Sequence, residues 1–356
     1  MKKFFIFFVF ICSCMGFATD ESANASAPGA YDADLFRKDV KVCFTDIEFL
    51  YWTAEVADLD YALTMQNPAP DDRMLYALGH YDRAKYNWDP GFRVTIGYFN
   101  APHYWQVYGT YTWQRIKGTN HSVKPTQDDL YLIPTWSAIF NLIVPEPVLT
   151  ADSYVRLNYN LADLVFDRVY ITNPHLRLKL LGALTGALIE QKFNVDYLTE
   201  HFVSRVHTMW RFMGIGFRLG VSLDWYLNFA DLYLTAKATT ATFIGSYKNL
   251  SYQTNDCGVL DDEDGEEAIE ETVRDGLYKD WRPSFETQFM VGPSYQKAFK
   301  SCRFELFAGY EMTNWFNLNE IYRSSTSFYP QTSKETYINN SMIALHGLTL
   351  RTTFDF

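Results

Sequence analysis

The chain has 356 residues, a formal net charge of −11 and an aromatic content of 17%. This length suffices for one large domain or one barrel, and the acidic balance argues against a nucleic-acid-binding protein, which needs a basic surface. The aromatic content is high for a soluble domain and typical of a membrane barrel with aromatic girdles at both interfaces.

The N-terminus has the features of an export signal. Met1-Lys2-Lys3 is basic, residues 4–12 form a continuous apolar run, and residues 16–18 contain small side chains suited to cleavage. We expect residues 1–18 to be a secretory signal peptide, which is too short to span a bilayer. A lipoprotein signal acylated at Cys14 is the weaker alternative, because its apolar stretch would be very short. Residues 19–41 are expected to form a flexible lead-in.

From residue 42 onward, apolar and polar residues alternate with the period of two that is typical of strands. The clearest case is residues 213–225, where every second side chain is apolar. Only residues 130–144 and 263–277 have a helical period, and both are predicted as helices between strands. The alternation predicts strands near residues 42–53, 59–65, 91–98, 104–113, 154–161, 176–189, 213–225, 229–243, 285–295, 302–313 and 348–356.

The last strand has two different faces. Leu348, Leu350, Phe354 and Phe356 lie on one face, while the other carries polar and charged residues. An aromatic last residue on the apolar face is a common ending of bacterial outer-membrane barrels. We therefore expect these four residues to close the barrel and to act as its assembly signal.

The sequence predicts an all-β protein, a transmembrane antiparallel β-barrel over residues 42–356 in the bacterial outer membrane. After the signal, no segment has the roughly 18 uninterrupted apolar residues of a membrane helix, so a membrane-spanning chain must be a closed barrel. We expect about twelve strands, with ten to fourteen open, and long extracellular loops. A soluble sandwich or lipocalin-like barrel is the alternative, because inverting the barrel preserves the alternation.

In the membrane barrel the apolar faces look outward and the charged faces look inward, which implies a hydrated lumen. Two functions remain open for the inward charged residues. They form structural ion pairs, or they form charged rings that set the ion selectivity of a pore, or both. The candidate pore-lining residues are Arg93, Arg156, Arg177, Lys179, Arg218, Asp224, Lys237, Glu286, Arg303, Glu305, Glu311 and Arg351.

Several short motifs carry a family resemblance. They are Phe49-Leu50-Tyr51-Trp52, residues 88–93 with Gly97-Tyr98, residues 214–220 with Asp224-Trp225, and the C-terminal residues 347–356. In order and spacing they resemble the Legionella- and Chlamydia-type pore-forming outer-membrane proteins. The resemblance implies an outer-membrane porin without catalytic residues. The acidic run at residues 261–267 departs from the expected pattern and is interpreted as a variable surface loop.

No enzyme, metal or cofactor site is predicted. The acidic run fails as a calcium loop because Leu260 stands at its first ligand position, and the seven histidines have no metal-ligand spacing. Once the signal is removed, Cys43, Cys257 and Cys302 remain, and their odd number leaves a thiol that is free or linked to another chain.

The predicted function is passive diffusion of ions and small hydrophilic solutes through the lumen. The alternative is a structural or adhesive surface protein with a plugged barrel. The expected partners are outer-membrane lipid, the barrel-assembly machinery and the solutes themselves, with homo-oligomers or disulfide-linked neighbours left open and no nucleic acid.

Overall fold

The computed structural model describes residues 41–66, 79–100, 103–127, 130–136, 148–173, 175–200, 202–227, 231–257, 269–299, 302–325 and 335–356. Apart from short turns, this part of the chain consists of β-strands. None of it forms a helix with the length and apolar content needed to cross a membrane. The expected signal peptide, the lead-in and the acidic run at residues 261–267 lie outside the described residues.

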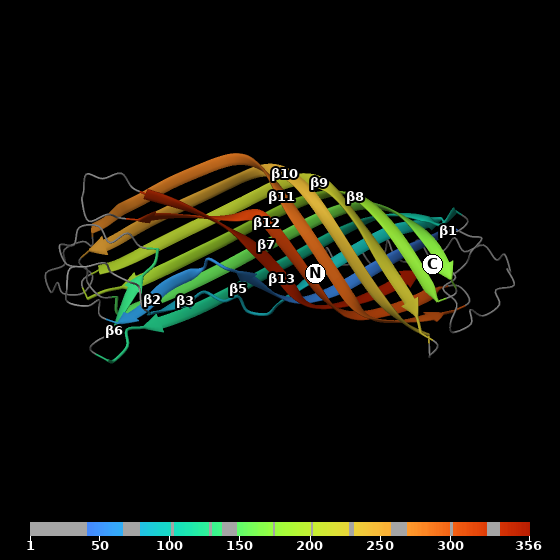
Figure 1. The fold of residues 1–356 in the computed structure, drawn as a ribbon, viewed down its shortest axis with the longest axis horizontal. Coiled ribbons are helices and arrows are strands. Elements are labelled where there is room, and N and C mark those ends of the chain that lie inside the picture. The colour runs from blue at the N-terminus through green and yellow to red at the C-terminus, as the bar shows by residue number, and fades with distance from the viewer. Residues whose placement is uncertain are drawn as a thin grey trace, which may run out of the picture.

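Ten strands form a closed antiparallel barrel (Figure 1). Neighbours in sequence pair in hairpins, and β1 closes the barrel by pairing with β13 on one side and β4 on the other. The barrel strands are β1 Lys41–Val56, β4 Asp89–Asn100, β5 Trp105–Val123, β7 Thr150–Asn173, β8 Leu176–Leu198, β9 Phe202–Tyr226, β10 Leu232–Cys257, β11 Ile269–Ala298, β12 Arg303–Ser325 and β13 Glu335–Asp355.

The two ends of the barrel differ in their connections. At one end the turns are short, at residues 101–104, 174–175, 227–231 and 299–302. Asp231 adopts a left-handed backbone conformation in one of these turns, with φ of 54°. The start of β1 and the end of β13 lie at this end too, since Phe44 pairs with Asp355. Outer-membrane barrels place their short turns in the periplasm, so the opposite end faces the cell surface.

The predicted closing strand is confirmed, but the expected number of twelve strands is wrong. Leu348 and Leu350 of β13 pair with Tyr51 and Phe49 of β1. The barrel has ten strands, the lower bound of the expected range, because its strands are long: β11 alone has 30 residues. The segment at 59–65, expected as a barrel strand, lies outside the barrel.

Three short strands form a separate sheet at the cell-surface end, in the order β3-β2-β6 (Figure 1). These are β2 Asp60–Gln66, β3 Gly79–Arg83 and β6 Leu130–Pro134, and we call them the cap sheet. Both predicted helices are wrong in the residues that the structure describes. Residues 130–134 form β6, and residues 269–277 form the start of β11. In each case pairing with a neighbouring strand overrides the local helical pattern.

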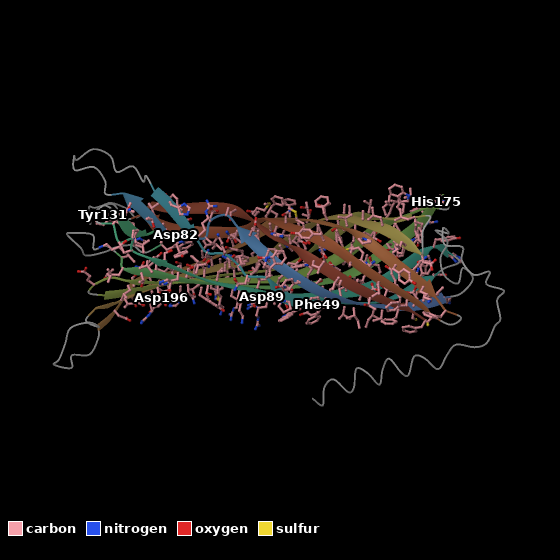
Figure 2. All side chains as sticks on the ribbon, turned by 90° about the horizontal axis from the view of Figure 1, so that it is seen from below. Phe49, Asp82, Asp89, Tyr131, His175 and Asp196 are labelled. Carbon is pink, nitrogen blue, oxygen red and sulfur yellow. The ribbon has the colours of Figure 1, made fainter. Side chains whose placement is uncertain are left out.

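The barrel has an apolar outer face toward its periplasmic end. Phe217, Leu219 and Ile215 of β9 are 70%, 65% and 73% exposed, and Phe166 and Leu184 project outward in the same way. Figure 2 shows apolar side chains covering this outer surface around Phe49, whereas polar side chains cover it toward Asp196. Eight of the ten barrel strands have 19 to 30 residues, about two to three times the length that a bilayer requires, so the barrel extends well beyond the lipid.

A charge placed in the middle of this apolar face tests its contact with lipid. Leu219→Arg is expected to lower the free energy of unfolding by about 2–4 kcal/mol, because a cation there must enter hydrocarbon. Reversible urea unfolding in phosphocholine vesicles measures the change. The control is Val123→Arg at the surface end of β5, where an exposed apolar side chain lies beyond the apolar band. Equal effects at the two positions would argue against a lipid-facing band.

Candidate functional site

The interior of the barrel contains a buried ion network at mid-height. Arg93 of β4 donates to Glu48 of β1 through Nη1 at 2.7 Å and to Glu311 of β12 through Nη2 at 2.7 Å. Its Nε donates to the Thr112 hydroxyl at 2.8 Å. Thr349 donates to Glu311 at 2.9 Å. The guanidinium therefore joins strands from both sides of the closure, and all three charged groups are at most 8% exposed.

A second arginine stands across the lumen. Arg218 of β9 donates to Glu286 of β11 at 2.8 Å, and its Nε lies 3.4 Å from Asp163 of β7. Gln288 connects the two networks, because its carbonyl accepts from Arg218 at 3.0 Å and its amide donates to Glu311 at 2.5 Å. Together the networks form a polar layer across the barrel.

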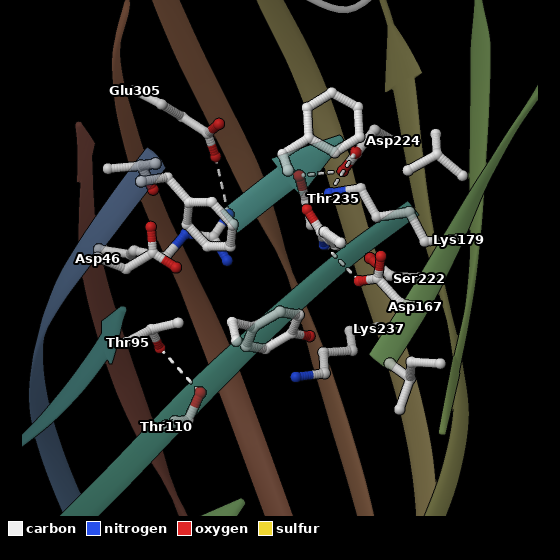
Figure 3. Close-up of a pocket in the computed structure, with 18 of the residues that line it drawn as sticks. Asp46, Thr95, Thr110, Asp167, Lys179, Ser222, Asp224, Thr235, Lys237 and Glu305 are labelled. Atoms are coloured by element: carbon white, nitrogen blue, oxygen red, sulfur yellow. Dashed lines mark hydrogen bonds and ion pairs between the residues drawn. The ribbon is translucent and has the colours of Figure 1, made fainter. Parts of the chain in front are cut away.

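A polar cavity of about 140 Å³ lies on the periplasmic side of this layer (Figure 3). Asp224 is held by Arg177 at 2.8 Å and faces Lys179 at 3.8 Å. Glu305 accepts from Arg351 at 2.8 Å. Lys237 also lines this cavity. A space of this size with many polar walls can hold several water molecules.

On the cell-surface side of the polar layer the lumen is filled mainly by apolar side chains, which we call the aromatic plug. Some buried polar groups pack among them, such as Arg282, whose guanidinium lies 3.7 Å from the centroid of the Tyr247 ring. Trp315, Tyr159 and Phe243 pack together, with ring centroids of Phe243 and Trp315 at 4.8 Å. Trp210 stacks on Tyr247 at 6.0 Å in the next layer. All five aromatic side chains are at most 2% exposed. The wider cluster includes Leu50, Trp52, Ile116, Val155, Leu157, Ile189, Phe193, Phe212, Leu318, Ile343 and Leu345.

The cap sheet packs onto this plug. Trp136 lies with its ring centroid 4.9 Å from that of Phe193, and its Nε1 donates to the Asp60 carbonyl at 2.5 Å. The Tyr197 hydroxyl donates to the Tyr61 carbonyl at 2.6 Å. Burial raises the pKa of Tyr61, so its ring stays neutral at physiological pH. In the described residues, the aromatic plug therefore fills the cell-surface half of the lumen, and the cap sheet covers it.

Eleven of the twelve candidate pore-lining residues point into the barrel, and Arg156 does not. Along β7 the buried inner positions are odd-numbered, including Val155 and Leu157, so Arg156 projects outward. The strand lies above the apolar band at this point, where the outer face meets water and the core lies inside. The same alternation therefore has the opposite orientation, and the prediction for Arg156 is wrong.

Several interior residues did not stand out in the sequence. Glu48 shares the polar face of its strand with Asp46, and this alternation in the sequence is the signal that identifies it as an inward residue. Asp163 and Asp167 lie past the predicted end of their strand at residue 161, and β7 in fact continues to Asn173. Cys43 and Cys302 are free thiols, and the side chain of Cys257 lies outside the described residues.

Comparison with known proteins gives one family match. The family model described as Legionella pneumophila major outer membrane protein precursor matches residues 44–356. No curated protein matches.

Solved structures that resemble the chain include the outer membrane protease OmpT of Escherichia coli, at 9% identity over 88% of this chain and 96% of that one, with a TM-score of 0.42. Another is the Pseudomonas putida toluene transporter TodX, at 9% identity over 93% and 92%, with a TM-score of 0.28. A FadL homologue of Pseudomonas aeruginosa has 7% identity over 96% and 94%, with a TM-score of 0.22. Family match and barrel geometry together place the chain in the outer membrane, and it belongs to the Legionella major outer membrane protein family.

Proposed function

We propose that this protein is a plugged outer-membrane barrel that acts as a structural or adhesive component of the cell surface. The observation that carries the proposal is the aromatic plug, in which Trp315, Phe243 and Trp210 fill the lumen above the ion networks. An aqueous diffusion path needs a continuous polar wall and space for water. Here the polar cavity ends below the plug, and the cap sheet packs against the plug from the other side.

The surface half of the barrel suits a role in contacts outside the membrane. Its outer wall is polar, with Asp152, Asp196 and His207 exposed on β7, β8 and β9. Strands that rise beyond the lipid hold such side chains on a rigid support. A rigid, closed and polar stalk is well suited to binding neighbouring proteins or host surfaces, and we assign it no catalytic role.

Passive diffusion of ions and small hydrophilic solutes is the second candidate. It is favoured by the polar cavity and by the resemblance to pore-forming outer-membrane proteins. In this case Arg218 and Arg351 would tune ion passage, and neutralising either would shift the reversal potential in a salt gradient.

Single-channel recording on refolded protein separates the two candidates. Heat-modifiable gel migration first verifies that the preparation is folded. The plugged barrel predicts no current steps in a planar bilayer at neutral pH. Regular ohmic steps from the same folded preparation would overturn it in favour of diffusion. Protease and lipase activity in detergent is expected to stay at background.

A further inference from the structure

A band of basic side chains surrounds part of the barrel just above the apolar outer face. On β9, Arg211 lies next to the exposed Met213 and Ile215 on the outer face, one outward position closer to the cell-surface end than Met213. On β11, Lys279 likewise lies next to the exposed Trp281 on its cell-surface side. We call the band the basic belt, and its members are Arg115 and Lys117 of β5, Arg156 of β7, Lys192 of β8, Arg211 of β9, Lys248 of β10 and Lys279 of β11.

The strand register places these cations directly opposite one another. Lys117 pairs with Arg156, and Arg156 pairs with Lys192, all with outward side chains. Like charges directly opposite each other on one face of a sheet are destabilising. Their concentration in a chain of net charge −11 therefore indicates that an anion compensates them when the protein is in its membrane.

A second run of like charge lies further around the barrel. Arg211 pairs with Lys248, which in turn pairs with Lys279. Two carboxylates lie beside the described belt. Glu190 pairs directly with Arg211, and its Oε1 is 3.9 Å from Lys192 Nζ, while Asp89 accepts from the backbone amide of Lys117 at 2.7 Å. Two carboxylates cannot neutralise the seven cations of the belt.

We propose that the basic belt binds the phosphorylated headgroups of the outer-leaflet glycolipid, lipopolysaccharide. The belt stands where the apolar face ends, on the side of the long connections that faces the cell surface, and so at headgroup height. Arginine matches phosphate through paired hydrogen bonds and lysine as a compact charge. Trp281, 76% exposed beside Lys279, is of the kind that anchors proteins at a membrane interface.

The test compares two triple variants. The belt variant carries Lys117→Gln, Arg156→Gln and Lys192→Gln. The control variant carries Lys41→Gln, Arg168→Gln and Lys297→Gln, which removes the same charge from exposed positions at the periplasmic end. Both are refolded in non-ionic detergent, and heat-modifiable migration verifies that each is folded. Binding of purified lipopolysaccharide, and of the same material stripped of phosphate, is measured by titration.

The belt variant is expected to bind phosphorylated lipopolysaccharide at least about tenfold more weakly than the unmodified protein, while the control variant binds as the unmodified protein does. Dephosphorylated material should bind all three equally weakly. Arg211→Gln with Lys248→Gln and Lys279→Gln provides a second variant, and Lys117→Arg with Lys192→Arg should retain binding. Equal affinity of belt and control variants, or no loss on dephosphorylation, would overturn the proposal. Full competition by millimolar inorganic phosphate would assign the belt to free phosphate instead.

Discussion

Replacing Arg93 by Met is expected to lower the free energy of unfolding by about 3–5 kcal/mol, because the change leaves Glu48 and Glu311 as unpaired charges inside the barrel. Both carboxylates accept from the one guanidinium at 2.7 Å. The two carboxylates come from β1 and β12, the neighbours of β13. Losing their ion pairs therefore weakens the part of the sheet that closes the barrel. Urea unfolding in phosphocholine vesicles, followed by tryptophan fluorescence, measures the change.

A double-mutant cycle isolates the pairing from the loss of packing. Glu311→Gln is combined with Arg93→Met, and the double variant is expected to be more stable than the sum of the two single effects predicts. Arg168→Met serves as the control, since Arg168 projects from the outer face near the periplasmic end and is exposed. If Arg93→Met and Arg168→Met cost the same, the network does not hold the barrel closed.

Truncating Trp315 to Ala is expected to cost about 3–5 kcal/mol, because it leaves a cavity at the centre of the aromatic plug. The indole is fully buried between Phe243 and Tyr159. The matched control is Trp281→Ala, which removes an outward indole and creates no internal cavity. The same unfolding measurement compares them, and comparable losses would show that Trp315 has no special packing role.

The plug also predicts a functional change. Combining Trp315→Ala with Phe243→Ala removes two rings that contact each other in the lumen. If the plug is what blocks the barrel, this double variant should produce current steps in a planar bilayer that the unmodified protein lacks. A silent and folded double variant would mean that the block lies elsewhere, for example at the cap sheet.

The sequence was a good guide in the membrane-embedded half of the barrel. Residues such as Phe92, Ile96, Phe217 and Leu219 alternate with Arg93 and Arg218, and the structure places the first group outside and the second inside. Lipid on one side and an ionic interior on the other make the two faces chemically distinct. The alternation was therefore sufficient to orient these segments.

The other half could not be oriented in this way. Val155, Leu157 and Tyr159 alternate with Arg156 and Asn158 in the same period, yet here the apolar residues point inward. The pattern states only that the two faces differ, and which face meets the core depends on whether lipid or water surrounds the strand. Whether lipid or water surrounds a residue depends on its height along the barrel, and this height follows from the full length of the strand. Because the alternation weakens near the strand ends, the sequence predicts strands that are too short.

Thiol accessibility inside the lumen tests the central claim, that the aromatic plug excludes water from the surface half of the barrel. In a background with Cys43, Cys257 and Cys302 replaced by Ser, a single cysteine is placed at Val155, a fully buried inward position of the plug, or at Ser222, which lines the polar cavity. In vesicles, a small water-soluble thiol reagent is predicted to label Ser222→Cys and to leave Val155→Cys unmodified. Equal labelling rates at the two positions would contradict the plugged barrel.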